Sequence, residues 1–132
     1  MTTNNFPVEP TIECHRRMVG QLLSDKFAID RVSDNQLHAI LGVSSEAGEL
    51  VDALKKAIFF DFPLDVTNCD EEFGDILFYI QLWCVVRGID IRDLLTQNDR
   101  KLRTRYPDGW SQDKAVNRDI EAERQVLEGG AQ

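Results

Sequence analysis

Apolar residues recur every three or four positions along most of the chain, and no run alternates cleanly between apolar and polar residues. The first spacing marks one face of an α-helix, whereas strict alternation is typical of a half-buried strand. The pattern therefore predicts an all-α fold, a helical bundle of four to five helices. The expected helical segments are residues 10–26, 33–58, 68–87, 90–106 and 111–128.

Capping residues and helix breakers set the expected boundaries. The sequence SDNQ, which starts at Ser33, matches a capping box, the reciprocal pair of hydrogen bonds that begins many helices. Pro63 interrupts the next apolar stretch, and we expect Asn68 to cap the third segment. Gly88 is expected to stop that helix, and Asp90 to cap the fourth.

The third segment is apolar around almost its whole circumference. Every residue from 76 to 86 except Gln81 is aliphatic, aromatic or cysteine. This composition predicts a central helix that is buried on all sides. A chain of 132 residues has few other helices with which to cover it. We therefore expect a second subunit to complete the bundle, in a homodimer or a homotetramer.

Length, charge and cysteine content bound the organisation and the partners. We expect one domain over residues 1–132, with a polar N-terminal arm at 1–9 and a C-terminal helix or arm at 111–132. Acids outnumber bases 23 to 15, which argues against a nucleic-acid partner, since phosphate-binding surfaces collect Lys and Arg. No stretch is apolar enough for a membrane span. We expect a cytoplasmic location for two reasons. The N-terminal sequence does not resemble a secretion signal, and the three cysteines include no CxxC pair.

Two pairs of carboxylates lie inside otherwise apolar helical stretches. Glu46 and Glu49 fall in SEAGEL, and Glu72 and Asp75 fall in EEFGDI. Each pair has i,i+3 spacing, so its members lie about 60° apart around the helix. Ionised carboxylates that leave water need a cation or dense hydrogen bonding to offset their lost hydration. Two such pairs on facing helices form an all-oxygen cage, which predicts a Mg²⁺ or Mn²⁺ site.

Other interpretations of the acids remain open at this point. They can be surface acids in ordinary ion pairs with nearby lysines or arginines. A ferritin-like di-iron site needs Glu-x-x-His motifs, and neither His15 nor His38 lies in either acid motif. Gly48 and Gly74, one in each motif, favour closely packed backbones. The two pairs together favour the metal site over surface acids.

Candidate phosphate-binding residues lie on the second and fourth segments. Asn98, Lys101 and Arg105 follow one another at i, i+3 and i+7, so they share a helix face. That face either contacts phosphates or is a solvated side of the helix. The same two interpretations apply to Lys56, which has Asp52 within reach for an ion pair.

These motifs, in this order and spacing, resemble the MazG-like all-α nucleoside triphosphate pyrophosphohydrolases. The resemblance covers SEAGELVDALKK, EEFGDILFYI, NDRKLRTRYPDGW and the trailing NRDIEAE, which is most of the chain after His38. In that family an ExxE helix and an ExxD helix form a divalent-metal site in a helical bundle. One difference is Ser45, where many members carry another Glu.

The resemblance implies roles for individual residues and an activity. It implies metal ligation and catalysis by Glu46, Glu49, Glu72 and Asp75, and it suggests nucleotide or phosphate contacts for Asn98 and Lys101. The implied reaction is Mg²⁺-dependent cleavage of the α–β phosphoanhydride bond of (deoxy)nucleoside triphosphates to a monophosphate and pyrophosphate. The alternatives are a phosphoribosyl-ATP-type pyrophosphohydrolase and a catalytically silent module that binds nucleotide or metal.

Overall fold

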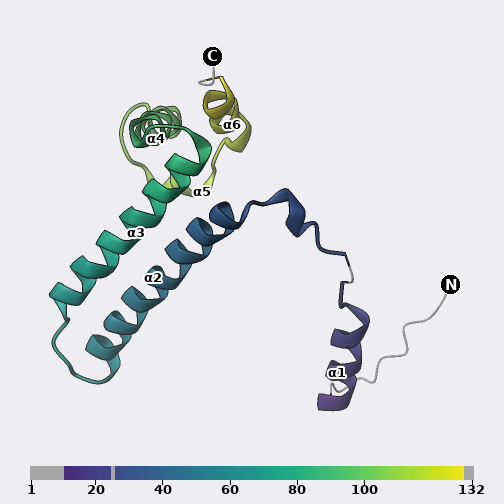
Figure 1. Ribbon diagram of the computed structural model, residues 1–132. Coiled ribbons are helices and arrows are strands. Elements are labelled where there is room, and N and C mark those ends of the chain that lie inside the picture. Colours follow the sequence, from purple (N-terminus) through teal and green to yellow (C-terminus); the bar gives the residue numbers. More distant parts are fainter. Residues whose placement is uncertain (1–10, 25, 130–132) are drawn as a thin grey trace. The chain divides into compact units, whose positions relative to one another are not determined.

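The computed structural model describes residues 11–24 and 26–129, and these residues confirm the all-α fold (Figure 1). Within these ranges the chain forms helices and no strand. The elements are α1 (Ile12–Gln21), the 3₁₀ turn η1 (Ile29–Arg31), α2 (Asp34–Phe59), α3 (Val66–Arg87), α4 (Ile91–Arg105), α5 (Gln112–Val116) and α6 (Ile120–Glu128).

The chain divides into two compact units, Met1–Val32 and Ser33–Gln132. In the first, Thr11 caps α1 by accepting a hydrogen bond of 3.1 Å from the Cys14 main-chain N–H. This helix ends at Gln21, earlier than expected, and a turn in which Ser24 bonds the main chain of Lys26 follows. The predicted arm at 1–9 lies outside the described residues. The predicted single domain over 1–132 stays a prediction.

An antiparallel hairpin of α2 and α3 dominates the second unit (Figure 1). The capping box at Ser33 is confirmed, with both of its reciprocal hydrogen bonds present. The predicted cap at Asn68 is wrong, because α3 begins earlier. Its N-cap is Asp65, whose carboxylate accepts the Asn68 main-chain N–H at 3.0 Å. Asn68 is therefore a residue of the first helical turn, and its side chain is not used for capping.

The helices of the hairpin lie close together at Gly42. A Cβ atom at this position would lie 2.2 Å from the ring of Tyr79, so any larger residue would displace the ring. We expected Gly48 and Gly74 at the close contact. A Cβ atom added at either of them would meet no side chain or facing helix within 4 Å in the described part of the chain. The register of the two helices therefore directs both of these glycines away from the hairpin interface.

Helix α3 is not buried on all sides within one chain. Cys84 is fully buried and α2 covers one face, while α4 contacts α3 near its end. Another face carries exposed apolar side chains. These are Phe73, Leu77, Phe78 and Val85. The expectation of complete burial therefore fails for the isolated chain, because α2 is the one long helix that packs along α3 in the described residues.

The C-terminal part, expected to form one helix or an arm, folds as two short helices. The chain leaves α5 at Asn117, whose side chain donates to Asp113 at 2.7 Å. Asp119 then caps α6 by accepting the Ala122 main-chain N–H at 3.0 Å. A side chain that bonds the backbone, as Asp119 does, competes with a continuous helix. The break lets α6 turn back and pack against α4.

Candidate metal centre

Three of the four predicted acids converge between α2 and α3. Glu46 on α2 and Glu72 and Asp75 on α3 each offer a carboxylate oxygen, and these oxygens lie within 4.8 Å of one another. Glu72 is buried, with 5% of its surface exposed, Glu46 is half-buried and Asp75 is exposed. The group therefore extends from the hairpin interface to the surface, where a solvent-borne ligand has access.

Two polar side chains contact the acids of this group. The Asn68 amide Nδ2 donates to Oε1 of Glu72 at 2.5 Å. The Ser45 hydroxyl lies 3.2 Å from Oε1 of Glu46 and 3.0 Å from the Gly42 carbonyl oxygen. Because a hydroxyl has one proton, Ser45 can donate to only one of these acceptors at a time. Sequence reasoning did not identify the role of Asn68, although its i,i+4 spacing from Glu72 was a usable signal.

The fourth predicted acid, Glu49, is exposed on α2 and is not a member of the converging group. It follows Glu46 by three residues, so it lies about 60° around the helix and one turn along it. Its charge contributes a smaller part of the raised pKa of Lys56, which is caused chiefly by the hydrogen bond to Asp52. Metal ligation by Glu49 stays a prediction.

Lys56 lies beyond the acid group, toward the turn between α2 and α3. Its Nζ is 2.8 Å from Oδ2 of Asp52 in an exposed ion pair. The same hydrogen bond, together with the positive charge of Lys56, lowers the pKa of Asp52. Lys56 also lines a pocket of about 200 Å³, together with Asp65 and Asn68. Because the ammonium group has three N–H donors, Lys56 can contact a phosphate either while it keeps Asp52 or after it leaves Asp52.

The three predicted residues of α4 have different surroundings. Asn98 is exposed and Lys101 is half-buried. Arg105 is turned toward α6, where its side chain is 15% exposed and pairs with Glu123. The structure brings none of the three into the converging acid group. Their contact with a nucleotide stays a prediction.

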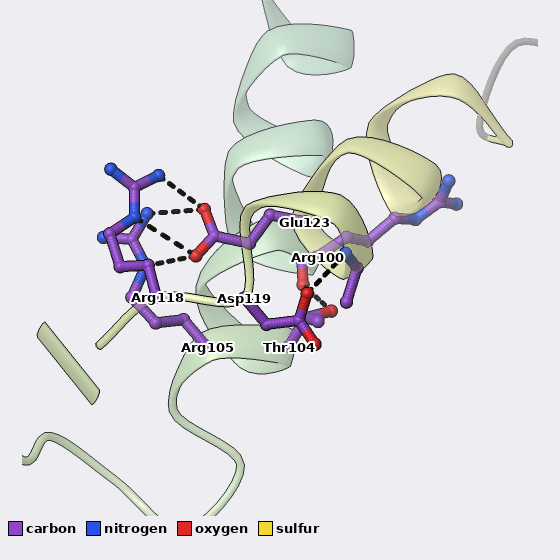
Figure 2. A network of polar contacts seen from close by, with 7 residues as sticks. Arg100, Thr104, Arg105, Arg118, Asp119 and Glu123 are labelled. Carbon is purple, nitrogen blue, oxygen red and sulfur yellow. Dashed lines mark hydrogen bonds and ion pairs between the residues drawn. The ribbon is translucent and has the colours of Figure 1, made fainter. Parts of the chain in front are cut away.

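Glu123 is the second buried acid in the described part of the chain, with 3% of its surface exposed. Figure 2 shows two guanidinium groups directed at its carboxylate. Arg105 donates to both oxygens at 2.8 and 2.7 Å, and Arg118 donates to both at 3.3 and 2.6 Å. The hydrogen bond from Arg105, followed by that from Arg118, lowers the pKa of Glu123 to about 2. This pairing joins α4 to α6 and was not predicted from the sequence.

The two buried acids thus differ in their compensation. Both oxygens of Glu123 accept hydrogen bonds from guanidinium groups. Within the described ranges, Glu72 accepts a side-chain hydrogen bond at one oxygen, and the donor is the neutral amide of Asn68. A buried carboxylate with so little compensation favours a nearby cation. The donor set of Glu46, Glu72 and Asp75 is all oxygen, which suits a hard divalent cation such as Mg²⁺ or Mn²⁺. The residues present therefore fit a divalent-metal site.

Comparison with protein families matches residues 34–110 to the MazG nucleotide pyrophosphohydrolase domain. The matched region contains α2, α3, α4 and all three acids of the group. Comparison with curated proteins and with solved structures finds no significant match. Within the described residues, no helix has the length and apolar character needed to cross a bilayer. Because the match covers more than half of the chain, the protein belongs to the MazG nucleotide pyrophosphohydrolase family.

Proposed function

We propose that the chain is a Mg²⁺-dependent nucleoside triphosphate pyrophosphohydrolase of the cytoplasm, with Mn²⁺ as an alternative cofactor. It would cleave the α–β phosphoanhydride bond of a nucleotide, with water as the second substrate, and release a monophosphate and pyrophosphate. The observation that carries this proposal is the convergence of Glu46, Glu72 and Asp75 inside the matched region. Hard cations held by carboxylates also explain how a chain of net charge −8 binds a polyanion.

Each part of the site has a distinct role in this proposal. A bound Mg²⁺ would lower the pKa of a water molecule and would stabilise negative charge on the phosphoryl oxygens. Glu46, Glu72 and Asp75 would hold the ion, and Glu49 would join them as a fourth ligand. The exposed edge of the group at Asp75 leaves room for the triphosphate. Lys56, Asn98 and Lys101 are the proposed phosphate contacts.

Arg105 already forms an ion pair, and this pair competes with its predicted contact to a phosphate. Its guanidinium is bonded to Glu123, so it can contact a phosphate only if that ion pair opens or is shared. We therefore propose Lys101, which is half-buried on the same helix, as the main cationic contact from α4.

A substrate panel with pyrophosphate detection tests the activity. The full chain is incubated with canonical and noncanonical nucleoside triphosphates and with phosphoribosyl-ATP, each with Mg²⁺ and with Mn²⁺. Pyrophosphate release from a triphosphate supports the proposal, and release from phosphoribosyl-ATP alone supports the related enzyme. The position of Ser45 beside Glu46 favours the silent-module alternative, because many relatives have a carboxylate there. Binding without turnover across the whole panel would support that alternative.

We further propose that a second copy of the chain covers the exposed apolar face of α3. Phe73, Leu77, Phe78 and Val85 are each more than half exposed along this face. Several exposed large apolar side chains on one helix are typical of a helix that packs against a partner. Gly74 lies in open space in the same helix, which would allow close approach of another backbone.

Light scattering at micromolar concentration is expected to give the mass of a dimer or a tetramer. Leu77→Glu is expected to shift the mass toward that of the monomer, because it places a charge in the centre of the proposed interface. Glu71→Gln, an exposed position on the same helix, serves as the control and should leave the assembly unchanged. A wild-type monomer would show that α3 does not need a partner.

A further inference from the structure

Asn68 is a polar residue that the proposed function has not yet used. Its amide Nδ2 lies 2.5 Å from Oε1 of Glu72, the most buried acid of the converging group. It is half-buried and lies within the first turn of α3. It is therefore the side chain that hydrogen-bonds this acid in the part of the chain that the structure describes.

Helix formation does not explain an asparagine at this position. Asn is a weak helix former inside a helix and is favoured at caps, where its side chain bonds the backbone. Here Asp65 already performs the capping, since its carboxylate accepts the Asn68 main-chain N–H at 3.0 Å. The Asn68 amide is consequently free to reach one turn forward to Glu72.

The hydrogen bond gives the two carboxylate oxygens of Glu72 different surroundings. Oε1 accepts a hydrogen bond from the amide, whereas Oε2 accepts none from a side chain in the described ranges. An amide is neutral, so it offsets part of the lost hydration and leaves the negative charge in place. Glu123 shows the contrasting case, in which guanidinium groups bond both oxygens and leave neither for a cation.

We propose that Asn68 is a positioning residue that restricts Glu72 to binding a divalent cation through one oxygen, and that it thereby favours Mg²⁺ or Mn²⁺ over Ca²⁺. This inference rests on the metal site of the proposed function. Carboxylate ligands that are held by hydrogen bonds to neighbouring side chains keep their orientation, and loss of such a neighbour typically weakens metal binding about 10–100-fold.

The preference follows from the coordination habits of the ions. Mg²⁺ requires near-ideal octahedral geometry at short distances, which a one-oxygen carboxylate satisfies. Ca²⁺ accepts longer distances, more ligands and a carboxylate that binds through both oxygens. When the amide is removed, Glu72 gains freedom to rotate and to offer both oxygens. The site should then lose more affinity for the smaller ions than for Ca²⁺.

Titration calorimetry of the full chain with Mn²⁺, Mg²⁺ and Ca²⁺ tests this proposal. Asn68→Leu, which keeps similar volume and removes the donor, is expected to lower Mn²⁺ affinity about 10–100-fold and Ca²⁺ affinity by clearly less. Asn68→Ala repeats the test with a strong helix former, and circular dichroism verifies the fold of both variants. The matched control is Asn117→Leu, because Asn117 donates to Asp113 at 2.7 Å with the same i,i+4 spacing at the end of α5.

The results of this titration distinguish a positioning role of Asn68 from a purely structural role, and they are independent of the proposed hydrolytic activity. Equal weakening of all three ions, or an unchanged Mn²⁺ to Ca²⁺ ratio, would overturn the positioning role. A wild type that binds Mn²⁺ but hydrolyses nothing would overturn the proposed activity and leave the selectivity test intact, since that test contains no nucleotide. A wild type that binds no Mn²⁺ would overturn both.

Discussion

Glu72→Gln is expected to lower pyrophosphate release by about 10²–10⁴-fold with either metal, while the helical circular dichroism spectrum stays unchanged. The substitution keeps the shape of the side chain and removes the charge of the most buried acid in the group. Metal-bound water and charge stabilisation together lower a barrier by several kcal/mol, and each 1.36 kcal/mol is about tenfold in rate. The pyrophosphate assay measures the loss directly, and calorimetry without nucleotide should show weakened Mn²⁺ binding.

Asp70→Asn is the matched control for this prediction. Asp70 is an exposed acid on the same helix, two residues from Glu72, so the variant loses the same charge outside the converging group. Its turnover should stay near that of the wild type. If Glu72→Gln behaves like Asp70→Asn, the acids are ordinary polar residues of the hairpin and the metal site is wrong. Glu49→Gln, in the same assay, decides whether the exposed fourth acid takes part.

Features of the fold that depend on neighbours in sequence were predictable. The capping box at Ser33 and the left-handed Gly88 that ends α3 are both present where expected. Each depends on hydrogen bonds or backbone angles within a few residues. The choice between Asp65 and Asn68 as the cap of α3 was harder, because both residue types cap well. With Asp65 as the cap, α3 gains nearly one more helical turn than it would have with Asn68, and the helix begins there.

Features that depend on the register between helices were not predictable from local patterns. The acid spacing placed Glu46 and Glu72 on apolar faces, but the rotation of α2 against α3 decides that Glu49 lies outside the converging group. The same rotation places Gly42, instead of Gly48, against a ring of the facing helix. A helical period fixes which residues share a face, and it does not fix which faces meet.

Glu123 was missed for a related reason. It lies 18 residues from Arg105 in sequence, and a charged residue in an amphipathic C-terminal segment is usually solvated. A signal was nevertheless present, because Ala122, Val126 and Leu127 make that side of the segment apolar. A buried acid on such a side requires a cation, and the nearest preceding long helix supplies one.

Glu123→Gln is expected to loosen α6 from α4 without unfolding the hairpin of α2 and α3. The variant keeps the shape of the side chain, but two guanidinium groups then face a neutral amide in a largely buried site (Figure 2). Hydrogen exchange of the amides in α6 should become at least about tenfold faster, the factor that corresponds to loss of one charge-assisted hydrogen bond. Glu128→Gln is the control on the same helix, because its ion pair with Arg124 is exposed and such pairs contribute little.

The pH dependence of the difference between wild type and Glu123→Gln tests the same contact independently. The pKa of Glu123 is lowered from 4.5 to about 2 by the bonds from Arg105 and Arg118. A group with a lowered pKa stabilises the folded state fully above its unfolded value and loses that contribution as the pH falls toward the folded value. The two proteins should therefore differ most above pH 4.5 and converge as the pH approaches about 2. Asp90, whose pKa is also about 2 because of its bonds from Arg92, titrates in both proteins, so its effect cancels in the difference. A difference that stays constant across this acidic range would mean that the charge of Glu123 does not hold α6 in place.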